Sequence, residues 1–164
     1  LAVGEVLNGP TRYDTYYLLD RGLHKNLPEG TEAKGLDKVF LGFDAQGQPI
    51  GFAITAAKPG FQDVIRMLYG YSPDTKKMLG LKVLENKETP GLGDKILETS
   101  FLEQFQGALT PLQKIKPGAG KGLAQEIDMI TGATISSRTV IDAVNASLEY
   151  WEPFLLPVWA EVQP

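Results

Sequence analysis

The stretch "KVFLGFDAQGQPIGFAITAA", Lys38 to Ala57, carries the clearest fold signal in the chain. Two runs rich in β-branched and aromatic residues flank "AQGQ", whose glycine and polar residues suit a tight turn. A second unit of the same kind follows, with "VIRMLYGYS" and "MLGLKVLE" on either side of "PDTKK". Both patterns predict β-hairpins, so we expect the centre of the chain to form an antiparallel meander sheet.

The two predicted hairpins resemble each other. Gly42 corresponds to Gly70 and Gly51 to Gly80, at offsets of 70 − 42 = 28 and 80 − 51 = 29 residues. One explanation is an internal duplication. The other is that any two meander hairpins share turn glycines and alternating apolar residues. The sequence leaves both explanations open.

Helical patterns follow the hairpins. Leu97, Phe101 and Phe105 recur every four residues, which predicts a helix with Asp94 as its N-cap. The short run "EIDMI" predicts a strand. A later apolar stripe predicts a helix that begins at Ser136 or Ser137, with Val140, Ile141, Val144 and Leu148 on its buried face. The tail "EPFLLPVWAEVQP" holds three prolines and is expected to be irregular. The expected fold class is therefore α+β, with about two main helices.

Composition bounds the remaining possibilities. The 164 residues include 43% hydrophobic residues, which is ordinary for one globular domain. The net charge of −4 argues against nucleic acid as a partner. No cysteine and one histidine exclude thiolate and histidine-rich metal centres, so we expect no metal site. Residues 1–35 are read as a lead-in segment with a strand or helix around Tyr13–Leu19, and residues 36–164 as the domain proper.

The loop "DMITGATISS", Asp128 to Ser137, runs into the second predicted helix. Gly132 lets the backbone turn sharply, and the first helical turn presents N–H groups without partners. These features suit an anion such as a phosphate. The hydroxyls of Thr131, Thr134, Ser136 and Ser137 would add donors. From the residues alone, a plain helix N-cap with extra small residues explains the same pattern.

Two strings point to a known family. Asp128-Met129-Ile130-Thr131-Gly132-Ala133-Thr134 fits the pattern Asp-x-x-(Ser/Thr)-Gly-Ala-Thr and resembles the flavinylation motif of the FMN-binding domain family. "NKETPGLGDKI", Asn86 to Ile96, resembles a segment found upstream of that motif in the same family. The family includes the G subunit of the Rnf electron-transport complex and the C subunit of the sodium-pumping NADH:quinone oxidoreductase. The resemblance covers roughly residues 36–150 and is closer to the Rnf protein.

The resemblance implies a site and a cofactor. In the family the last threonine of the motif, here Thr134, carries FMN through a phosphoester bond. A separate magnesium-dependent flavin transferase attaches it, taking FMN from FAD and releasing AMP. Asp128 would be recognised by that transferase or would orient the loop; a simple loop hydrogen bond is the alternative. The other residues expected to hold the phosphate end are Thr131, Gly132, Ala133, Ser136 and Ser137.

The turn Glu88–Gly93 is the expected seat of the isoalloxazine ring. Gly91 and Gly93 allow the backbone to lie close to a flat ring, because no Cβ intrudes. Thr89 would bond the polar edge of the ring, and Leu92 would cover a face. Without the resemblance, the same residues would be a connection between a strand and a helix.

The implied function is electron transfer between redox subunits of an ion-translocating membrane complex, with no complete reaction by the domain itself. The chain starts at Leu1. The resemblance implies an apolar anchor of about 20 residues upstream and a domain on the extracytoplasmic, periplasmic face. One alternative is a flavin-binding module of another respiratory or regulatory membrane protein. A second is a domain that binds a phosphate ligand reversibly.

Overall fold

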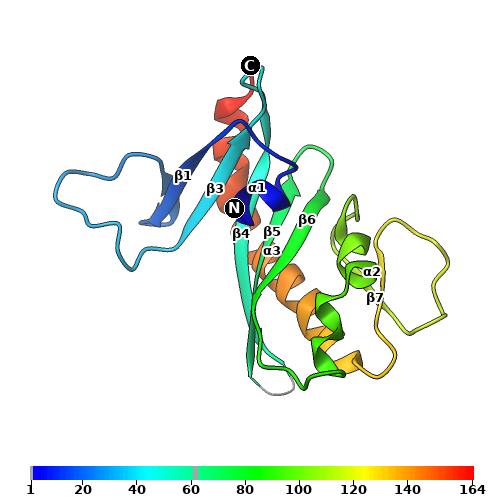
Figure 1. Ribbon diagram of the computed structural model, residues 1–164. Helices are drawn as coiled ribbons and strands as arrows, with labels where there is room; N and C mark the ends of the chain where they lie inside the picture. Colours follow the sequence, from blue (N-terminus) through cyan, green and yellow to red (C-terminus); the bar gives the residue numbers. More distant parts are fainter. Residues whose placement is uncertain (1, 61–62) are drawn as a thin grey trace.

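The computed structural model describes residues 2–60 and 63–164 of the chain. Its centre is a six-stranded sheet of strand order β2-β1-β3-β4-β5-β6, in which every neighbouring pair is antiparallel. This architecture confirms the predicted α+β class and the meander (Figure 1). The strands are β1 (Arg12–Leu19), β2 (Gly22–His24), β3 (Lys38–Phe43), β4 (Pro49–Pro59), β5 (Val64–Ser72) and β6 (Lys77–Glu85).

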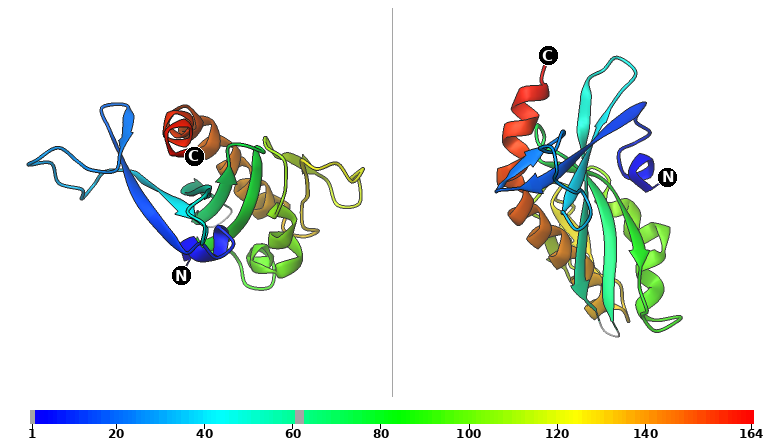
Figure 2. Two further views of the ribbon diagram at one scale, coloured as in Figure 1. Left: turned by 90° about the horizontal axis from the view of Figure 1, so that it is seen from above. Right: turned by 90° about the vertical axis from the view of Figure 1, so that its left-hand side faces the viewer.

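Both predicted hairpins form, as β3–β4 and β5–β6. In the first turn, Asp44 Oδ1 accepts the N–H groups of Gln46 and Gln48, each at 2.9 Å. The segment around Tyr13–Leu19 is a strand, and it pairs with β3 in the same sheet. The division expected at residue 35 falls in the loop between β2 and β3. The hairpin β1–β2 and this loop project from the body of the molecule (Figure 2, left).

The glycines shared by the two hairpins have a packing role. The short N-terminal helix α1 (Ala2–Val6) lies against β5 and β6, on the face of the sheet opposite the long helix (Figure 2, right). A Cβ on Gly42 would lie 2.7 Å from Leu7 Cδ1, and one on Gly70 would overlap the Val6 carbonyl oxygen. Bare backbone at these strand positions therefore makes room for α1.

The other face of the sheet is covered by α3 (Thr134–Val162), a helix of 29 residues that carries the main core. The predicted apolar stripe is confirmed, because its four residues are all buried. The largest buried side chains beneath the helix include Phe52, Tyr69 and Tyr71. Two hydroxyls tie the helix to β5: Tyr69 donates to Ser147 Oγ at 2.9 Å and Tyr71 to Glu152 Oε2 at 2.6 Å.

The prediction of an irregular tail is wrong, since α3 continues to Val162 through Pro153 and Pro157. A proline inside a helix removes one hydrogen bond and costs about 3 kcal/mol. Packing outweighs that cost here. Trp159 is buried with its ring 5.9 Å from that of Phe52, and its Nε1 donates to Asp74 Oδ1 at 2.8 Å.

The prediction of a single helix after the hairpins is also wrong. The segment divides into the 3-10 helix η1 (Gly93–Leu97), the short helix α2 (Thr99–Leu102) and the 3-10 helix η2 (Glu103–Phe105). Extended backbone at Glu98 (ψ 138°) interrupts it. Leu97 is 48% exposed, so only the two phenylalanines face the core. Asp94 is not an N-cap, because η1 starts after Leu92 without a side-chain cap.

A small parallel pair completes the fold, formed by β7 (Gln113–Ile115) and β8 (Glu126–Asp128). The strand expected from "EIDMI" is thus present in its first three residues. It delivers the chain to the start of α3, at the end of the molecule where the turn after β6 also lies (Figure 1). The fold therefore brings the two sequence motifs to one place.

Candidate functional site

A cavity of about 320 Å³ lies between the turn that follows β6 and the first turn of α3. This volume is at the small end of the range for small-molecule sites. The two segments that form it are separated by about forty residues of sequence and meet because η1 packs against α3. The lining residues are Thr89, Leu92, Gly93, Gly132, Ala133, Thr134, Ile135 and Ser136.

Thr134 is the first residue of α3 and lines the cavity. Gly132 precedes it with a φ of +82°, a conformation that costs glycine little, and the Ala133 N–H donates to the Ile130 carbonyl at 3.0 Å. The N-cap residue Ala133 makes no side-chain cap. Among residues 2–60 and 63–164, no side-chain hydrogen bond involves Thr134. Thr134 therefore lines the cavity with a hydroxyl that has no partner among the described residues, and it stands at the helix end whose first N–H groups have no intrahelical acceptor.

The two serines use their hydroxyl protons inside the protein. Ser137 is buried, donates to the Ala133 carbonyl at 2.7 Å, and accepts the Ile130 N–H at 3.0 Å. Ser136 donates to Glu88 Oε1 at 2.6 Å. Because a hydroxyl has one proton, neither serine has a donor left for a ligand in this arrangement. Ser137 shapes the loop, and Ser136 joins the helix to the turn.

Glu88 is 4% exposed and lies behind the cavity wall. Its carboxylate accepts the Ser136 bond, and its N–H donates to Asn86 Oδ1 at 3.2 Å. A Cβ on Gly93 would lie 2.7 Å from Glu88 Cβ and 2.8 Å from Ser136 Oγ. Gly93 is therefore required for the close approach of the turn and the helix. The contact with a flat ring that the sequence suggested for Gly93 stays a prediction.

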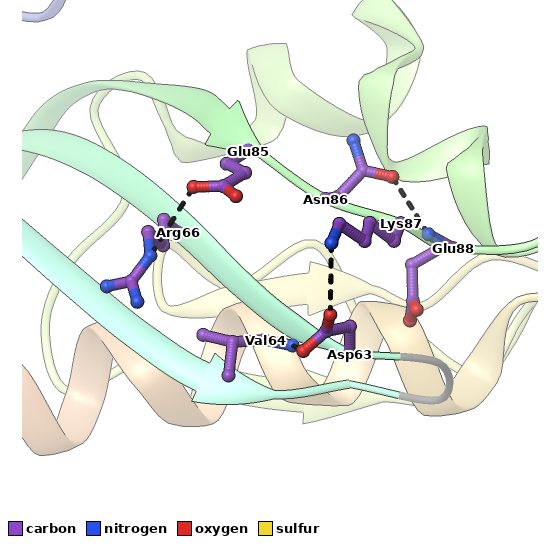
Figure 3. Close-up of polar contacts among 7 residues, drawn as sticks. All are labelled: Asp63, Val64, Arg66, Glu85, Asn86, Lys87 and Glu88. Atoms are coloured by element: carbon purple, nitrogen blue, oxygen red, sulfur yellow. Dashed lines mark hydrogen bonds and ion pairs between the residues drawn. The ribbon is translucent and has the colours of Figure 1, made fainter.

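Figure 3 shows how the approach to this turn is held. At the end of β6, Lys87 reaches Asp63 at 3.6 Å, beside the start of β5. The Val64 amide and, after it, the Lys87 ammonium hold the pKa of Asp63 below its ordinary value. Both side chains of this pair are well exposed, so it contributes little to stability.

Five of the expected site residues lie outside the cavity lining, namely the buried Glu88 and Ser137 described above and three exposed residues. Gly91 is exposed with a φ of +77°, so it serves the turn rather than the wall. Thr131 is exposed at the outer side of the loop. Asp128 is exposed too; its backbone is held by Gln104, which accepts the Asp128 N–H at 2.7 Å and donates to its carbonyl at 3.2 Å. Its carboxylate lies near Gly120, in the loop before β8.

Two residues at the site were missed from sequence. Ile135 lines the cavity and is 49% exposed, and Leu92 opposite it is 52% exposed. An isoleucine that falls off the predicted apolar stripe, directly after the Gly-Ala-Thr string, was the sequence signal that could have found it. The second is Lys95, whose Nζ lies 3.9 Å from the point that a Cβ on Gly132 would occupy. Sequence offered no signal for it, since a lysine in a helical turn is ordinarily a solvated residue.

The described part of the chain holds no group of three or more acidic or histidine side chains that would bind a metal ion. Within it, no helix is both long enough and apolar enough to cross a bilayer.

The fold matches that of a protein of known structure. The crystal structure of NqrC from Shewanella oneidensis superimposes with a TM-score of 0.77, covering 97% of this chain and 95% of that one at 18% identity. At this identity the likeness concerns the fold alone. A sequence model of the FMN-binding domain matches residues 60–149, which include both motifs. The chain therefore belongs to the FMN-binding domain family, and the resemblance noted from its motifs is confirmed.

Within that family the chain is similar to proteins named as the G subunit of the ion-translocating oxidoreductase complex. The protein of Methanosarcina acetivorans is 32% identical over 111 residues, which are 68% of this chain and 56% of that protein. The protein of Pectobacterium atrosepticum is 31% identical over 149 residues, or 89% of this chain and 66% of that protein. The chain thus spans between about half and two thirds of the length of these relatives.

Proposed function

We propose that this chain is the FMN-carrying electron-transfer domain of an Rnf-type ion-translocating oxidoreductase complex, equivalent to the G subunit of that complex. The observation that carries the proposal is the cavity in which the "ETPGLG" turn meets the "TGAT" loop. The names of the similar proteins supply the complex. The domain by itself completes no reaction and passes electrons between neighbouring redox subunits.

Thr134 is the proposed attachment residue, through a phosphoester between its Oγ and FMN. The geometry supports this choice over the neighbouring hydroxyls. Ser136 and Ser137 are buried, and their hydroxyls donate hydrogen bonds to Glu88 and to the Ala133 carbonyl. Thr131 is exposed but does not line the cavity. Thr134 lines it, with a hydroxyl that has no partner among the described residues.

The residues present fit FMN at both of its ends. The N–H groups and the dipole of α3 suit the phosphate, since both favour negative charge. Leu92 and Ile135 offer apolar surface, and Gly93 offers bare backbone, to a flat ring. When bound, FMN supplies reversible one- and two-electron redox chemistry. The protein's part is to hold the phosphate, cover part of the ring and keep the turn against the helix.

Attachment requires help from outside the chain. A threonine hydroxyl is a poor nucleophile without a base, and no side chain of the described residues is hydrogen-bonded to Thr134 Oγ. We propose that a magnesium-dependent flavin transferase supplies the base. A bond forms between Thr134 Oγ and the FMN phosphorus of FAD, the pyrophosphate bond breaks, AMP leaves, and the hydroxyl proton passes to the transferase. Asp128, exposed on the approach to the loop, would be recognised by that enzyme.

The proposal extends to location and partners. The complex named for the relatives translocates ions, which requires a membrane. We propose that the domain lies on the extracytoplasmic, periplasmic face, tethered by an apolar segment of about 20 residues upstream of Leu1. Its partners would be the other redox subunits of the complex. The gene sequence upstream of Leu1 tests the tether: a start without an apolar span would place the domain elsewhere.

The central test is co-expression with a flavin transferase. Intact mass should rise by the mass of FMN less one water, and peptide mass spectrometry should place the increase on Thr134. The acid-precipitated chain should stay yellow. Yellow colour lost to the supernatant would instead indicate reversible binding, and an increase on Thr131, Ser136 or Ser137 would overturn the assignment. A chain that carries covalent flavin but comes from a gene cluster without other redox subunits would favour a module of another respiratory or regulatory protein.

A further inference from the structure

The ammonium of Lys95 lies beside the loop that leads to Thr134. Lys95 belongs to η1, and its Nζ is 3.9 Å from the point that a Cβ on Gly132 would occupy. Gly132 lines the cavity, two residues before Thr134. The cation therefore reaches across from the "ETPGLG" side of the site to the "TGAT" side. Lys95 and Gly132 are 132 − 95 = 37 positions apart in sequence, so only the fold brings them together.

Lys95 differs from several other lysines in having no acidic partner. Lys87 pairs with Asp63 at 3.6 Å, and Lys114 with Asp142 at 2.8 Å. No carboxylate oxygen of residues 2–60 and 63–164 lies within 4.0 Å of Lys95 Nζ. Its side chain is nonetheless half-buried rather than free in solvent. A half-buried cation without a counter-charge favours an anion next to it.

We infer that Lys95 is a positioning residue that pairs with the phosphoryl group joined to Thr134. This inference rests on the proposed function and deepens it. A phosphate esterified to both ribityl and threonine keeps one negative charge. The N–H groups and dipole of α3 meet this charge from one side, and the three N–H donors of Lys95 meet it from the turn. The pair would also lock η1 against the loop once flavin is attached.

The role assigned to Lys95 concerns the phosphate end of FMN and not the ring. Leu92, Ile135 and Gly93 are the residues of the cavity that suit the ring. Removal of the charge at Lys95 should therefore alter the phosphorus environment and the rate of flavin attachment. It should leave the visible absorption of the flavin unchanged. A merely structural role for Lys95 would move none of these readouts selectively.

The test compares Lys95→Gln, Lys95→Arg and the wild-type domain, each loaded by a flavin transferase. Lys116→Gln is the matched control, because Lys116 is an exposed lysine outside the site. We expect the ³¹P resonance of the linked phosphate to shift in Lys95→Gln, to stay near the wild-type position in Lys95→Arg, and to coincide with wild type in Lys116→Gln. The initial rate of FMN incorporation should fall about three- to tenfold in Lys95→Gln alone.

The outcomes of this test distinguish the inference about Lys95 from the proposed function. A ³¹P resonance and a loading rate in Lys95→Gln equal to those of wild type, with FMN on Thr134, would overturn the inference and leave the proposed function standing. Failure of the wild-type domain itself to accept FMN on Thr134 would overturn the proposed function and the inference with it. Loss of loading in Lys95→Gln with rescue by Lys95→Arg would support the inference, provided that circular dichroism shows a folded Lys95→Gln domain.

Discussion

The two ends of α3 are built for different purposes. At its start, Thr134 lines a cavity, no side chain caps the helix, and the nearby serines donate to Glu88 and to the Ala133 carbonyl. At its end, the helix runs through two prolines and buries Trp151, Leu155 and Trp159 against the sheet. Both ends break a local rule of helix construction, since one lacks a side-chain cap and the other contains proline.

The two departures from ordinary helix construction have different physical explanations. The first N–H groups at the start have no side-chain cap, which leaves them to water or to a ligand such as the proposed phosphate. The prolines at the other end have no ligand to serve. There the aromatic side chains contribute the stability that the missing hydrogen bonds remove. The start of the helix is therefore left without a cap beside the candidate site, and packing keeps the end helical although its prolines oppose a helix.

The largest expected effect is at the start of α3. Thr134→Ala should abolish covalent flavin, because it removes the proposed attachment hydroxyl and because Ser136, the other hydroxyl of this loop in the cavity lining, donates its proton to Glu88. The melting temperature of the flavin-free domain should stay within about 2 °C of wild type, since Thr134 makes no internal side-chain bond. Intact mass after loading checks the first part, and calorimetry checks the second. Thr99→Ala, at an exposed threonine, is the control and should load fully; covalent flavin on the Thr134→Ala chain would refute the assignment.

The next effect lies at the far end of the helix. Trp159→Ala should lower the free energy of unfolding by about 3–5 kcal/mol, because it removes a buried ring packed on Phe52 and leaves a cavity. Urea denaturation measures this loss. Leu156→Ala is the matched change at a residue 47% exposed, and should cost less than about 1 kcal/mol. Equal losses in the two variants would mean that the end of α3 is not held by its buried face.

A smaller effect separates two glycines of the turn. Gly93→Ala should cost about 1–3 kcal/mol and shift the absorption of bound flavin, because its Cβ would press on Glu88 and Ser136 at the cavity wall. Gly91→Ala should cost about 1–2 kcal/mol through its positive φ, with the absorption unchanged. Visible spectra of loaded variants, read beside urea denaturation, distinguish them. A spectrum that responds only to Gly91→Ala would restore the ring contact that the sequence suggested for Gly91.

The smallest effect concerns the middle of α3, where Tyr69 meets Ser147. Burial raises the pKa of Tyr69 above its ordinary value, so the folded state favours the neutral phenol. A raised pKa gives stability that is complete below about pH 10 and is lost as pH rises beyond it. By pH 11 the free energy of unfolding should fall by about 1 kcal/mol from this residue. Tyr69→Phe should show a shallower alkaline decline in urea denaturation; an identical slope would exclude Tyr69 as its source.

Much of the fold was predictable because its signals are local. Alternating apolar residues around "AQGQ" and "PDTKK" specify two hairpins, and the stripe that ends at Leu148 specifies the buried face of a helix. The helix expected at Leu97–Phe105 was wrong in continuity, since extended backbone at Glu98 interrupts the pattern. The sequence left two explanations for the repeated glycines, an internal duplication or glycines that any two meander hairpins share. The structure adds a third explanation at Gly42 and Gly70, the seat of α1.

The residues that line the candidate cavity were more predictable than the part that each of them plays. The residues expected from the two motif regions include every residue of the cavity lining except Ile135, and Ser136 among them bonds to Glu88 of the other region. From the residues alone the four hydroxyls of the loop could not be told apart, and only the family resemblance singled out Thr134. In the structure, hydrogen bonds to partners that are close only after folding distinguish them. Folding likewise brings the ammonium of Lys95 beside Gly132.

The sequence by itself determined the meander, the buried stripe of the helix and the family, because these reside in short patterns whose physical meaning does not depend on distant residues. Only the tertiary structure decided that α3 continues through Pro153 and Pro157. Only it decided that the Thr134 hydroxyl has no partner among the described residues while two neighbouring serines are hydrogen-bonded inside the protein. The physical reason is the same in both cases. Aromatic packing against the sheet, and a hydrogen bond between residues 48 positions apart, are free-energy terms that exist only once the chain has folded.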